Sequence, residues 1–382
     1  MDKYEFCEGG IYYDINEDEE SLTVVSCIHE EGPQEIEIPS RIKWYCKDYI
    51  VRIIGTKAFS DYENLTSITI PETVKKIRDN AFKGCKGLKT ISIPSSVSQI
   101  YGNVFSECKG IESITVDCFN PDFDSRGNCN AIIETRTNKL ITGFKNTIIP
   151  DSVTTIGNRA FMDCTGLTSI SIPDNVESIE AYAFYGCSGL TSINIPNSVT
   201  SIGEAAFGGC ENLTSISIPD GVECIEAGTF WNCRNLSSVT IPNSVTSIGV
   251  SAFDNCAILE RIIIPESVSC IEERAFSDGQ SLKTIKIPNG VETIEPNTFE
   301  ECYKLISVVI PESVAAIKDQ AFRLCTSLEV ILCFAINPPT LEEDVFLDVP
   351  LKYVKLFVPS EAVEAYKAAE GWKEFGAIIP MP

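Results

Sequence analysis

The chain has 382 residues, of which 44% are hydrophobic, and its 54 acidic and 30 basic side chains give a formal net charge of -24. This charge repels phosphate backbones and anionic lipids, which argues against nucleic-acid and membrane-surface binding. No stretch approaches the 18 apolar residues of a membrane span, so no membrane insertion is expected. The single histidine, His29, excludes a multi-histidine metal site and leaves one imidazole as a candidate base.

The N-terminal segment precedes any regular repeat. It has neither a basic n-region nor an apolar h-region, so a secretory signal is not expected within it. The acidic run from Glu17 to Glu20 has the character of a solvent-exposed hairpin turn.

An internal repeat then occupies most of the chain. Ile-Pro dipeptides recur every 23 residues from Pro150 to Pro311, and two more end at Pro71 and Pro94. The units share the pattern LxxIxIPxxVxxIxxxAFxxCxx. A fixed period of 23 residues is too short for paired helices and fits one coil of a leucine-rich-repeat solenoid. The fold is therefore expected to be a one-dimensional stack of coils without a central globular core.

Each part of the unit predicts one element of a coil. LxxIxI alternates like a strand, and the proline after it cannot donate to a sheet, so it marks the strand's exit. VxxI predicts a second short extended segment on the opposite wall. AFxxC has the spacing of a single helical or 3₁₀ turn with its apolar side inward. The phenylalanines are expected to form a continuous internal spine: Phe59, Phe82, Phe105, Phe161, Phe184, Phe207, Phe230, Phe253, Phe276, Phe299 and Phe322.

One repeat is stretched. Pro94 and Pro150 lie two periods and ten further residues apart, and Asp117 takes the missing proline position after Ile114-Thr115-Val116. The extra residues, between about 117 and 149, are expected to form an added hairpin.

These repeats resemble the BspA-like leucine-rich repeat family of bacteria, whose unit is IPxxVxxIxxxAFxxC. The resemblance implies an α/β-type but mainly β solenoid, a right-handed superhelix of stacked 23-residue coils with parallel strands and short helical turns. It implies three regions: an N-terminal β-hairpin cap (1–48), the repeat solenoid (49–333) and a C-terminal cap (334–382) with a short helix over 360–370. Members are mostly surface or secreted proteins implicated in adhesion and protein binding.

Cysteine is the first candidate for chemistry. Nine cysteines share one repeat position, where a small apolar thiol is expected to fill the inner corner of each coil: Cys85, Cys108, Cys164, Cys187, Cys210, Cys233, Cys256, Cys302 and Cys325. Parallel stacking holds neighbouring thiols too far apart for disulfides, so this series should be reduced. Away from it, Cys118 with Cys129 and Cys7 with Cys27 are the two pairings left open. No CxxC motif exists, so no metal site is expected.

Catalysis finds no support in the sequence. His29 lies in an acidic loop, no phosphate-cradling glycine loop is present, and no carboxylate pair breaks the repeat pattern. We therefore expect no enzyme, no catalytic residue and no cofactor.

Binding residues are instead expected on the strand wall. The outward positions of LxxIxI are the residue before the first isoleucine and the residue between the two. In the middle coils they make a hydroxyl-rich wall: Ser169 and Ser171, Ser192 and Asn194, Ser215 and Ser217, Ser238 and Thr240. Toward the C-terminus they change to a set that we call the predicted patch: Arg261, Ile263, Thr284, Lys286, Ser307 and Val309.

Two cations beside apolar side chains on an acidic chain predict a contact site. The alternative, that these positions only guard the sheet, stays open. Trp231 is expected to point off the convex turn, where it could stack on a sugar or a partner.

The sequence therefore predicts a non-enzymatic protein-binding module, adhesin-like at the cell surface or secreted, whose ligand is a host or bacterial surface protein. The alternatives are a cytoplasmic scaffold or regulator using the same wall and, in third place, a carbohydrate-binding protein.

Overall fold

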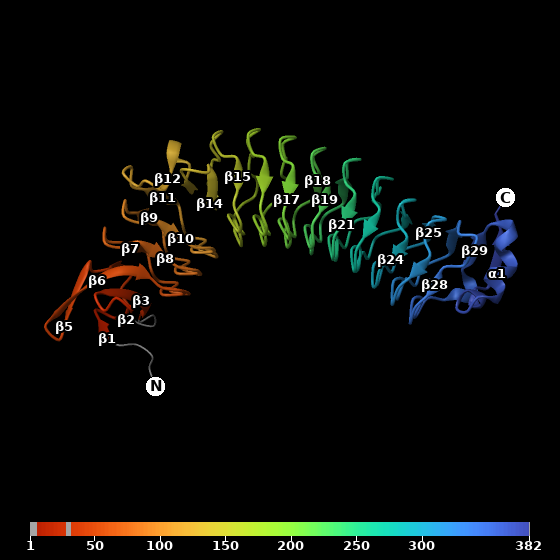
Figure 1. Cartoon of the computed structure of the whole chain (residues 1–382), viewed down its shortest axis with the longest axis horizontal. Helices are drawn as coiled ribbons and strands as arrows, with labels where there is room; N and C mark the ends of the chain where they lie inside the picture. Colours follow the sequence, from red (N-terminus) through yellow and green to blue (C-terminus); the bar gives the residue numbers. More distant parts are fainter. Residues whose placement is uncertain (1–5, 28–31, 382) are drawn as a thin grey trace. The chain divides into compact units, whose positions relative to one another are not determined.

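The computed structural model describes residues 6–27 and 32–381. The chain divides into two compact units, Met1–Val176 and Glu177–Pro382. Figure 1 labels the strands and the helix along the chain. The strands of the first unit are β1 Phe6–Glu8, β2 Ile11–Ile15, β3 Ser21–Cys27, β4 Glu35–Glu37, β5 Arg41–Trp44, β6 Lys47–Ile54, β7 Ser67–Thr69, β8 Lys76–Ile77, β9 Thr90–Ile93, β10 Gln99–Ile100, β11 Ser113–Val116, β12 Phe123–Asp124, β13 Ala131–Glu134, β14 Lys139–Gly143 and β15 Thr155–Ile156.

The second unit contains the remaining strands and the α-helix. They are β16 Ser178–Ile179, β17 Ser201–Ile202, β18 Ser215–Ser217, β19 Cys224–Ile225, β20 Ser238–Thr240, β21 Ser247–Ile248, β22 Cys270–Ile271, β23 Thr284–Lys286, β24 Thr293–Ile294, β25 Ser307–Ile310, β26 Ala316–Ile317, β27 Val330–Cys333, β28 Thr340–Leu341, β29 Lys355–Val358, β30 Ala377–Pro380 and α1 Val363–Ala368. Single 3₁₀ turns occupy Arg126–Asn128 in the first unit and Leu351–Tyr353, Ser360–Ala362 and Trp372–Glu374 in the second.

The first unit begins with antiparallel pairing and continues with parallel pairing. β1, β2 and β3 form an antiparallel meander, so the hairpin expected near the N-terminus is present. β3 then joins β6 in parallel, and β6 continues to β8 and β10. On the other wall, β4, β7, β9 and β11 pair in parallel. Each coil thus contributes one strand to each of two walls, as LxxIxI and VxxI predict.

The second unit repeats this arrangement with the period of the sequence. β18 pairs with β20, Ser215 opposite Ser238, and β19 pairs with β21, Cys224 opposite Ser247. Residues one period apart are therefore direct neighbours on the same wall. The expected mainly β solenoid with parallel strands is confirmed.

The AFxxC segment differs from the expected helical turn. In the coil of Phe207 it is a succession of tight turns, closed by backbone bonds from Ala206 to Gly203 (3.2 Å) and from Cys210 to Phe207 (3.1 Å). Gly209 stands at φ 70°, and Asn232 takes the same place in the next coil at φ 58°. Left-handed backbone interrupts a helix, and glycine and asparagine adopt it at least cost. The segment is compact without being helical.

Backbone hydrogen bonds also link these turns from coil to coil. The phenylalanine N–H donates to the residue before the next phenylalanine, as from Phe184 to Ala206 (2.8 Å). The N–H of the second residue after a repeat phenylalanine donates to the carbonyl of the residue that directly follows the next repeat phenylalanine, as from Gly186 to Gly208 (2.8 Å). We call this pair of bonds the turn ladder. It supplements the two strand walls.

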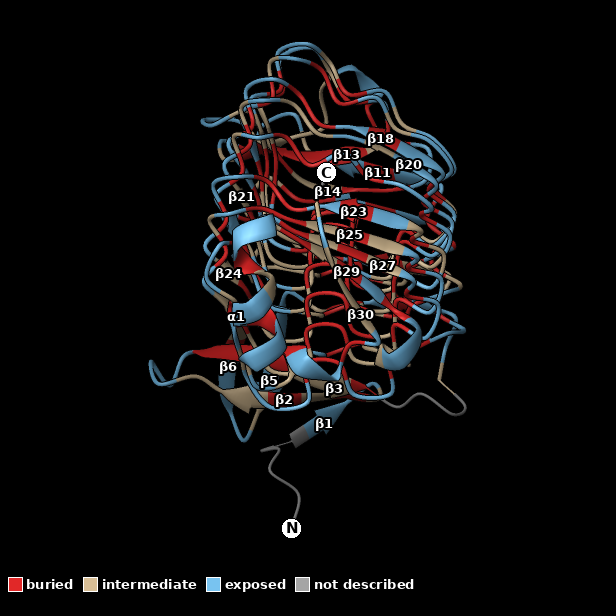
Figure 2. Cartoon of the chain, turned by 90° about the vertical axis from the view of Figure 1, so that its right-hand side faces the viewer, coloured by how far each residue is buried: buried red, intermediate tan, exposed pale blue. Residues whose placement is uncertain are grey.

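The core lies inside the coils, where Figure 2 shows the buried residues. All eleven repeat phenylalanines are at most 4% exposed. Within the second unit their rings stack from Phe184 to Phe322 with centroids 5.4–5.8 Å apart. In the first unit the parallel stack of Phe59, Phe82 and Phe105 ends at Phe105, whose neighbour Phe144 packs edge-on at 6.0 Å. The parallel stacking is therefore interrupted at the inserted hairpin, where an edge-on ring contact replaces it.

The stretched repeat explains this break. β13 and β14 form the expected antiparallel hairpin, and β14 then pairs in parallel with β15 of the following coil. Gly143 donates to the carbonyl of Ala160 (2.8 Å), and the chain runs on to Pro150 without a cysteine-containing turn. One AFxxC turn is absent where the hairpin has been inserted.

The C-terminal segment closes the second unit. β27, β29 and β30 extend one wall in parallel, and α1 falls within the expected 360–370 range. Trp372 is 1% exposed, and its indole N–H donates to the carbonyl of Pro339 (2.8 Å). Among residues 6–27 and 32–381, no helix is long and apolar enough to cross a bilayer.

Candidate binding site

The outward positions of the strand wall lie where the alternation predicts. All eight Ser, Asn and Thr side chains named for the middle coils are exposed, Ser169 and Ser171 in the first unit and the other six in the second. Their isoleucine neighbours, such as Ile216 and Ile218, are 4% and 3% exposed. Ile170, Ile193 and Val239 are half-buried, so the inward positions are less exposed than the outward ones in every one of these coils.

The structure brings the predicted patch together. Arg261 forms a parallel bridge with Thr284, Thr284 lies opposite Ser307, and Lys286 lies opposite Val309. Arg261, Ile263, Thr284 and Lys286 are exposed, Ile263 to 84%. Ser307 and Val309 are only half-exposed. The six residues therefore form one contiguous surface, open at its Arg261 end and more enclosed at its Val309 end.

The charge of this surface is lower than its sequence indicates. Lys286 Nζ lies 2.5 Å from one carboxylate oxygen of Glu266, and the other oxygen accepts from the backbone and side-chain N–H groups of Asn289. The hydrogen bond from Lys286 is the main cause that lowers the pKa of Glu266. No ion pair involves Arg261 among the described residues. Arg261 is thus the uncompensated cation of the patch, since Lys286 is already neutralised.

Three residues that the sequence analysis missed extend this surface. Along the same outward line, Val309 lies opposite Leu332, Leu332 opposite Phe357 and Phe357 opposite Ile379. All four side chains are half-exposed, and we call them the apolar stripe. Leu332 occupies the outward position of an LxxIxI-type strand. The alternation of its strand could have identified Leu332. Phe357 and Ile379 were missed because residues 334–382 were assigned to a cap and not to a further part of the wall.

Trp231 is 38% exposed and its ring stacks on that of Tyr185, with centroids 6.2 Å apart and planes 6° apart. These residues lie two repeat periods apart, and Gly208 occupies the equivalent position between them. A Cβ at Gly208 would come within 3.0 Å of the Tyr185 ring, so the glycine provides the space for that ring.

The cysteines behave as core residues. Seven of the nine repeat thiols donate to the carbonyl of a phenylalanine 26 residues earlier, at 2.9–3.4 Å. Burial raises the pKa of Cys233 and of Cys302 to about 12. Cys164 is the exception to full burial, being half-buried. All 17 cysteines are free in this structure.

Neither open disulfide pairing occurs. Cys7 lies opposite Tyr12 on β2, which separates it from Cys27 on β3, and Cys118 is exposed whereas Cys129 is buried. Among the described residues, no group of three or more His, Cys, Asp or Glu could hold a metal ion. His29 lies outside the described residues.

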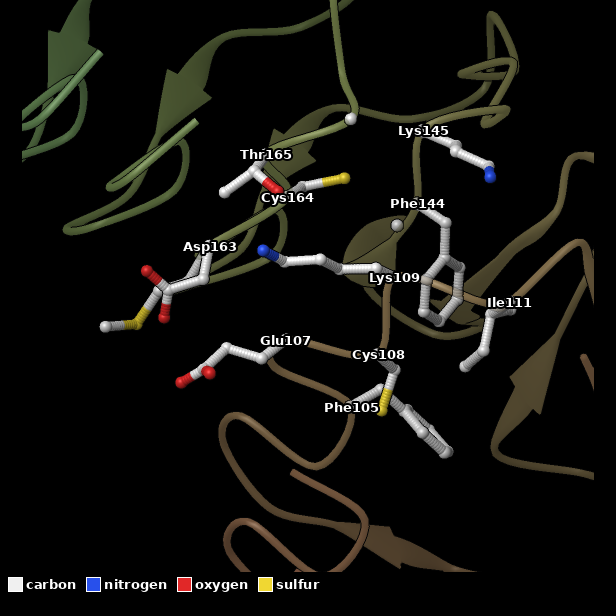
Figure 3. Close-up of a pocket in the computed structure, with 13 residues that line it drawn as sticks. Phe105, Glu107, Cys108, Lys109, Ile111, Phe144, Lys145, Asp163, Cys164 and Thr165 are labelled. Atoms are coloured by element: carbon white, nitrogen blue, oxygen red, sulfur yellow. The ribbon is translucent and has the colours of Figure 1, made fainter. Parts of the chain in front are cut away.

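A hollow of about 170 Å³ opens beside the inserted hairpin (Figure 3). Phe105, Ile111 and Phe144 form an apolar side, and Cys108 and Cys164 also line the hollow. Lys109 extends across the hollow toward Asp163 and Thr165. Burial raises the pKa of Asp163, whose carboxylate accepts from Ser106 (3.0 Å), and burial raises the pKa of Cys164 to about 11. The sequence analysis did not predict this site.

The parallel walls, the 23-residue period and the stacked phenylalanines define a leucine-rich-repeat solenoid. The family described as BspA type leucine rich repeat region matches residues 48–126, 132–260 and 251–366. The chain belongs to this family.

Solved structures of similar proteins agree with this assignment. A leucine rich cell surface protein from Faecalibacterium prausnitzii is 30% identical, with 85% of this chain and 93% of that chain covered and a TM-score of 0.53. A leucine-rich repeat protein from Bacteroides ovatus has the same fold at 24% identity, with 99% and 100% covered and a TM-score of 0.55. No curated protein matches the chain.

Proposed function

We propose that this protein is a non-enzymatic interaction module of the bacterial cell surface that binds a protein ligand through the strand wall of its second unit. The observation that carries this proposal is that the predicted patch, with its exposed Ile263, continues into the apolar stripe along one wall of parallel strands. Aligned apolar side chains beside a cation provide the kind of surface that protein partners bury. The wall is rigid, so binding requires little reorganisation.

The family supports the same role. Leucine-rich-repeat members are typically protein-interaction modules, and the structure from Faecalibacterium prausnitzii is described as a cell surface protein. The adhesin-like function and the surface location are extended to this chain on that basis. The hydroxyl-rich wall of the middle coils then flanks the contact without dominating it.

A capture experiment tests the proposal. Immobilised wild-type protein is exposed to surface-protein extracts of host cells and of bacteria, and the partners retained are identified and titrated. Ile263→Asp and the double variant Arg261→Glu/Lys286→Glu should each weaken binding of a retained partner about tenfold or more, because they place negative charge in the contact. Ser217→Asp, an equally exposed wall substitution outside the patch, is the matched control. A partner whose affinity is unchanged in both patch variants would exclude this surface.

A further inference from the structure

The turn ladder has a consistent rule within each unit. For nine repeat phenylalanines, the second residue after the ring donates to the residue after the next phenylalanine at 2.6–2.9 Å. Examples are Asp61 to Lys83 and Gly84 to Ser106 in the first unit. The phenylalanine N–H is equally regular and donates to the carbonyl of the residue before the next repeat phenylalanine, as from Phe59 to Ala81 and from Phe82 to Val104.

The coil of Phe105 breaks this rule, because the next coil has the inserted hairpin in place of a turn. Within the described residues, neither the N–H of Phe105 nor that of Glu107 has an acceptor. Met162 also lines the hollow, and its carbonyl stands at the position that accepts in nine other coils but receives no hydrogen bond from the described residues. The Ser106 hydroxyl bridges the two coils at one point by donating to the Asp163 carboxylate (3.0 Å), and beside this bridge the unpaired backbone donors and the unpaired acceptor flank the hollow. Such groups favour a polypeptide that pairs with both.

The hollow between these groups fits one apolar side chain. Its volume is about 170 Å³, and Phe105, Ile111 and Phe144 line one side of it. An engineered apolar cavity of about 150 Å³ is enough to take up benzene. A leucine-sized side chain therefore matches the volume of this hollow.

The charge beside the hollow indicates what flanks that side chain. Lys109 is the fourth residue after its phenylalanine. At the same position in neighbouring coils, Lys86 Nζ pairs with Glu63 at 2.5 Å. Lys109 extends toward Asp163 and its charge acts to lower the pKa of that group, but no ion pair forms at Lys109 among the described residues, and the neighbouring Glu107 is engaged by Lys83 at 3.0 Å. The missing turn is where a carboxylate would meet Lys109.

We propose that the gap between the coils of Phe105 and Phe161 is a docking site for a peptide segment of a partner protein, which supplies the missing turn. The segment accepts from Glu107 N–H, donates to the Met162 carbonyl, places an apolar side chain in the hollow and pairs a carboxylate with Lys109. This deepens the interaction function and rests on it for the nature of the partner. The site lies entirely in the first unit and does not involve the patch.

A peptide fits these features better than a small anion does. An anion would use the backbone donors and Lys109 but would leave the Met162 carbonyl unpaired and the apolar walls unfilled. The regular coils of this chain supply a template for the occupant. Residues 208–213, Gly-Gly-Cys-Glu-Asn-Leu, form the corresponding turn of another coil and carry Glu211 at the position that faces Lys109.

The probe is therefore a synthetic hexapeptide of residues 208–213, acetylated and amidated, with alanine in place of Cys210 to prevent oxidation. It is titrated into the full chain while amide hydrogen exchange is followed by mass spectrometry. A Kd on the order of 0.1–1 mM is expected for so short a peptide. Exchange should slow in 105–111 and not in the equivalent segment 207–213 of a regular coil. No protection of 105–111 at saturating probe overturns the proposal.

Charge exchange locates the peptide. A second probe replaces the glutamate with lysine, and Lys109→Glu should reverse the preference between the two probes by about tenfold in each direction. Lys43→Glu, a charge reversal on exposed β5, is the matched control and should leave both affinities unchanged. Equal binding of both probes by wild type and by Lys109→Glu overturns the proposal.

A filling variant checks the hollow itself. Cys164→Leu places a larger apolar side chain into the hollow and should abolish probe binding, while its thermal unfolding stays close to wild type. Undiminished probe binding by folded Cys164→Leu shows that the peptide binds elsewhere and overturns the site. Cys164→Leu should lose the protection of 105–111 and still bind the partner that the patch retains. This result would separate the docking site from the proposed function, because only the former depends on the hollow.

Discussion

The phenylalanine of each coil is the residue on which the core most depends. Phe207 is fully buried and stacks on Phe184 at 5.4 Å and on Phe230 at 5.8 Å, so its removal leaves a cavity shared by three coils. Phe207→Ala should lower the free energy of unfolding by about 3–5 kcal/mol. Ser217→Ala, at an exposed position, should change it by less than about 0.5 kcal/mol. Urea denaturation measures both, and equal losses would contradict the inward and outward assignment.

The thiols offer a second test at this scale. The thiolate is the nucleophile, and burial raises the pKa of Cys302 to about 12. At pH 8 this group is therefore almost entirely protonated, and it gains thiolate only as the pH approaches its raised pKa. Brief treatment of the native protein with iodoacetamide at pH 8 should modify the exposed Cys7, Cys46, Cys118, Cys224 and Cys270.

The buried repeat cysteines should remain unmodified under the same conditions and react only after denaturation. Peptide mass spectrometry reports each site separately. Cys164, whose pKa is raised to about 11 and which is half-buried, should react more slowly than the exposed group and faster than Cys302. Native labelling of Cys302 at the rate of Cys224 would show that the repeat thiols are not sealed inside the coils.

At the scale of elements, the inserted hairpin is fitted closely to the next coil. A Cβ on Gly143, the last residue of β14, would lie 2.2 Å from the buried ring of Phe161. Gly143→Ala should therefore lower the free energy of unfolding by about 1–3 kcal/mol, since a buried ring must shift. Gly102, where an added Cβ meets nothing closer than 3.7 Å, is the control, and Gly102→Ala should be nearly neutral. Similar melting temperatures for the two variants would contradict this packing.

The elements also show why part of the structure follows from the sequence and part does not. Period and alternation are local properties, so the two walls, the inward Phe and Cys positions and the outward serines were predictable from one repeat. The tight turns were not, because AFxxC has the same spacing in a helical turn and in a turn with left-handed residues. The hairpin was predictable from the extra residues. That the Glu107 N–H finds no acceptor among the described residues was not, because it depends on the hairpin lacking the carbonyl that a regular turn would offer to the neighbouring coil.

The candidate surface divides in the same way. Alternation placed Arg261, Ile263, Thr284 and Lys286 on the exposed face, but pairing of Lys286 with Glu266 depends on rotamers that a sequence does not specify. Phe357 and Ile379 lie in irregular sequence after the last repeat. Only the register of β29 and β30 aligns them with Val309 and Leu332. Half-exposure of Ser307 and Val309 likewise reflects neighbouring coils and not their own pattern.

At the scale of the whole molecule, stability should be additive along the chain, since each coil contacts mainly its neighbours. Pro219 and Pro242 occupy equivalent positions one period apart in the second unit. Deleting residues 220–242 removes one period and joins Pro219 to Asn243, so both walls, the phenylalanine stack and the turn ladder can close again. The shortened protein should fold, with an unchanged far-ultraviolet circular dichroism per residue and a modestly lower melting temperature.

Deleting residues 220–230 instead removes about half a period and joins a strand exit to a turn. In that variant the inward positions that follow the junction no longer meet their equivalents in the preceding coil, and apolar residues are placed on the outside. A one-residue slip already moves a strand's side chains to the opposite face. This shorter deletion should therefore be more damaging than the longer one, with loss of cooperative thermal unfolding. If the longer deletion were the more damaging, stability would have to reside in long-range contacts that a coil-by-coil solenoid does not make.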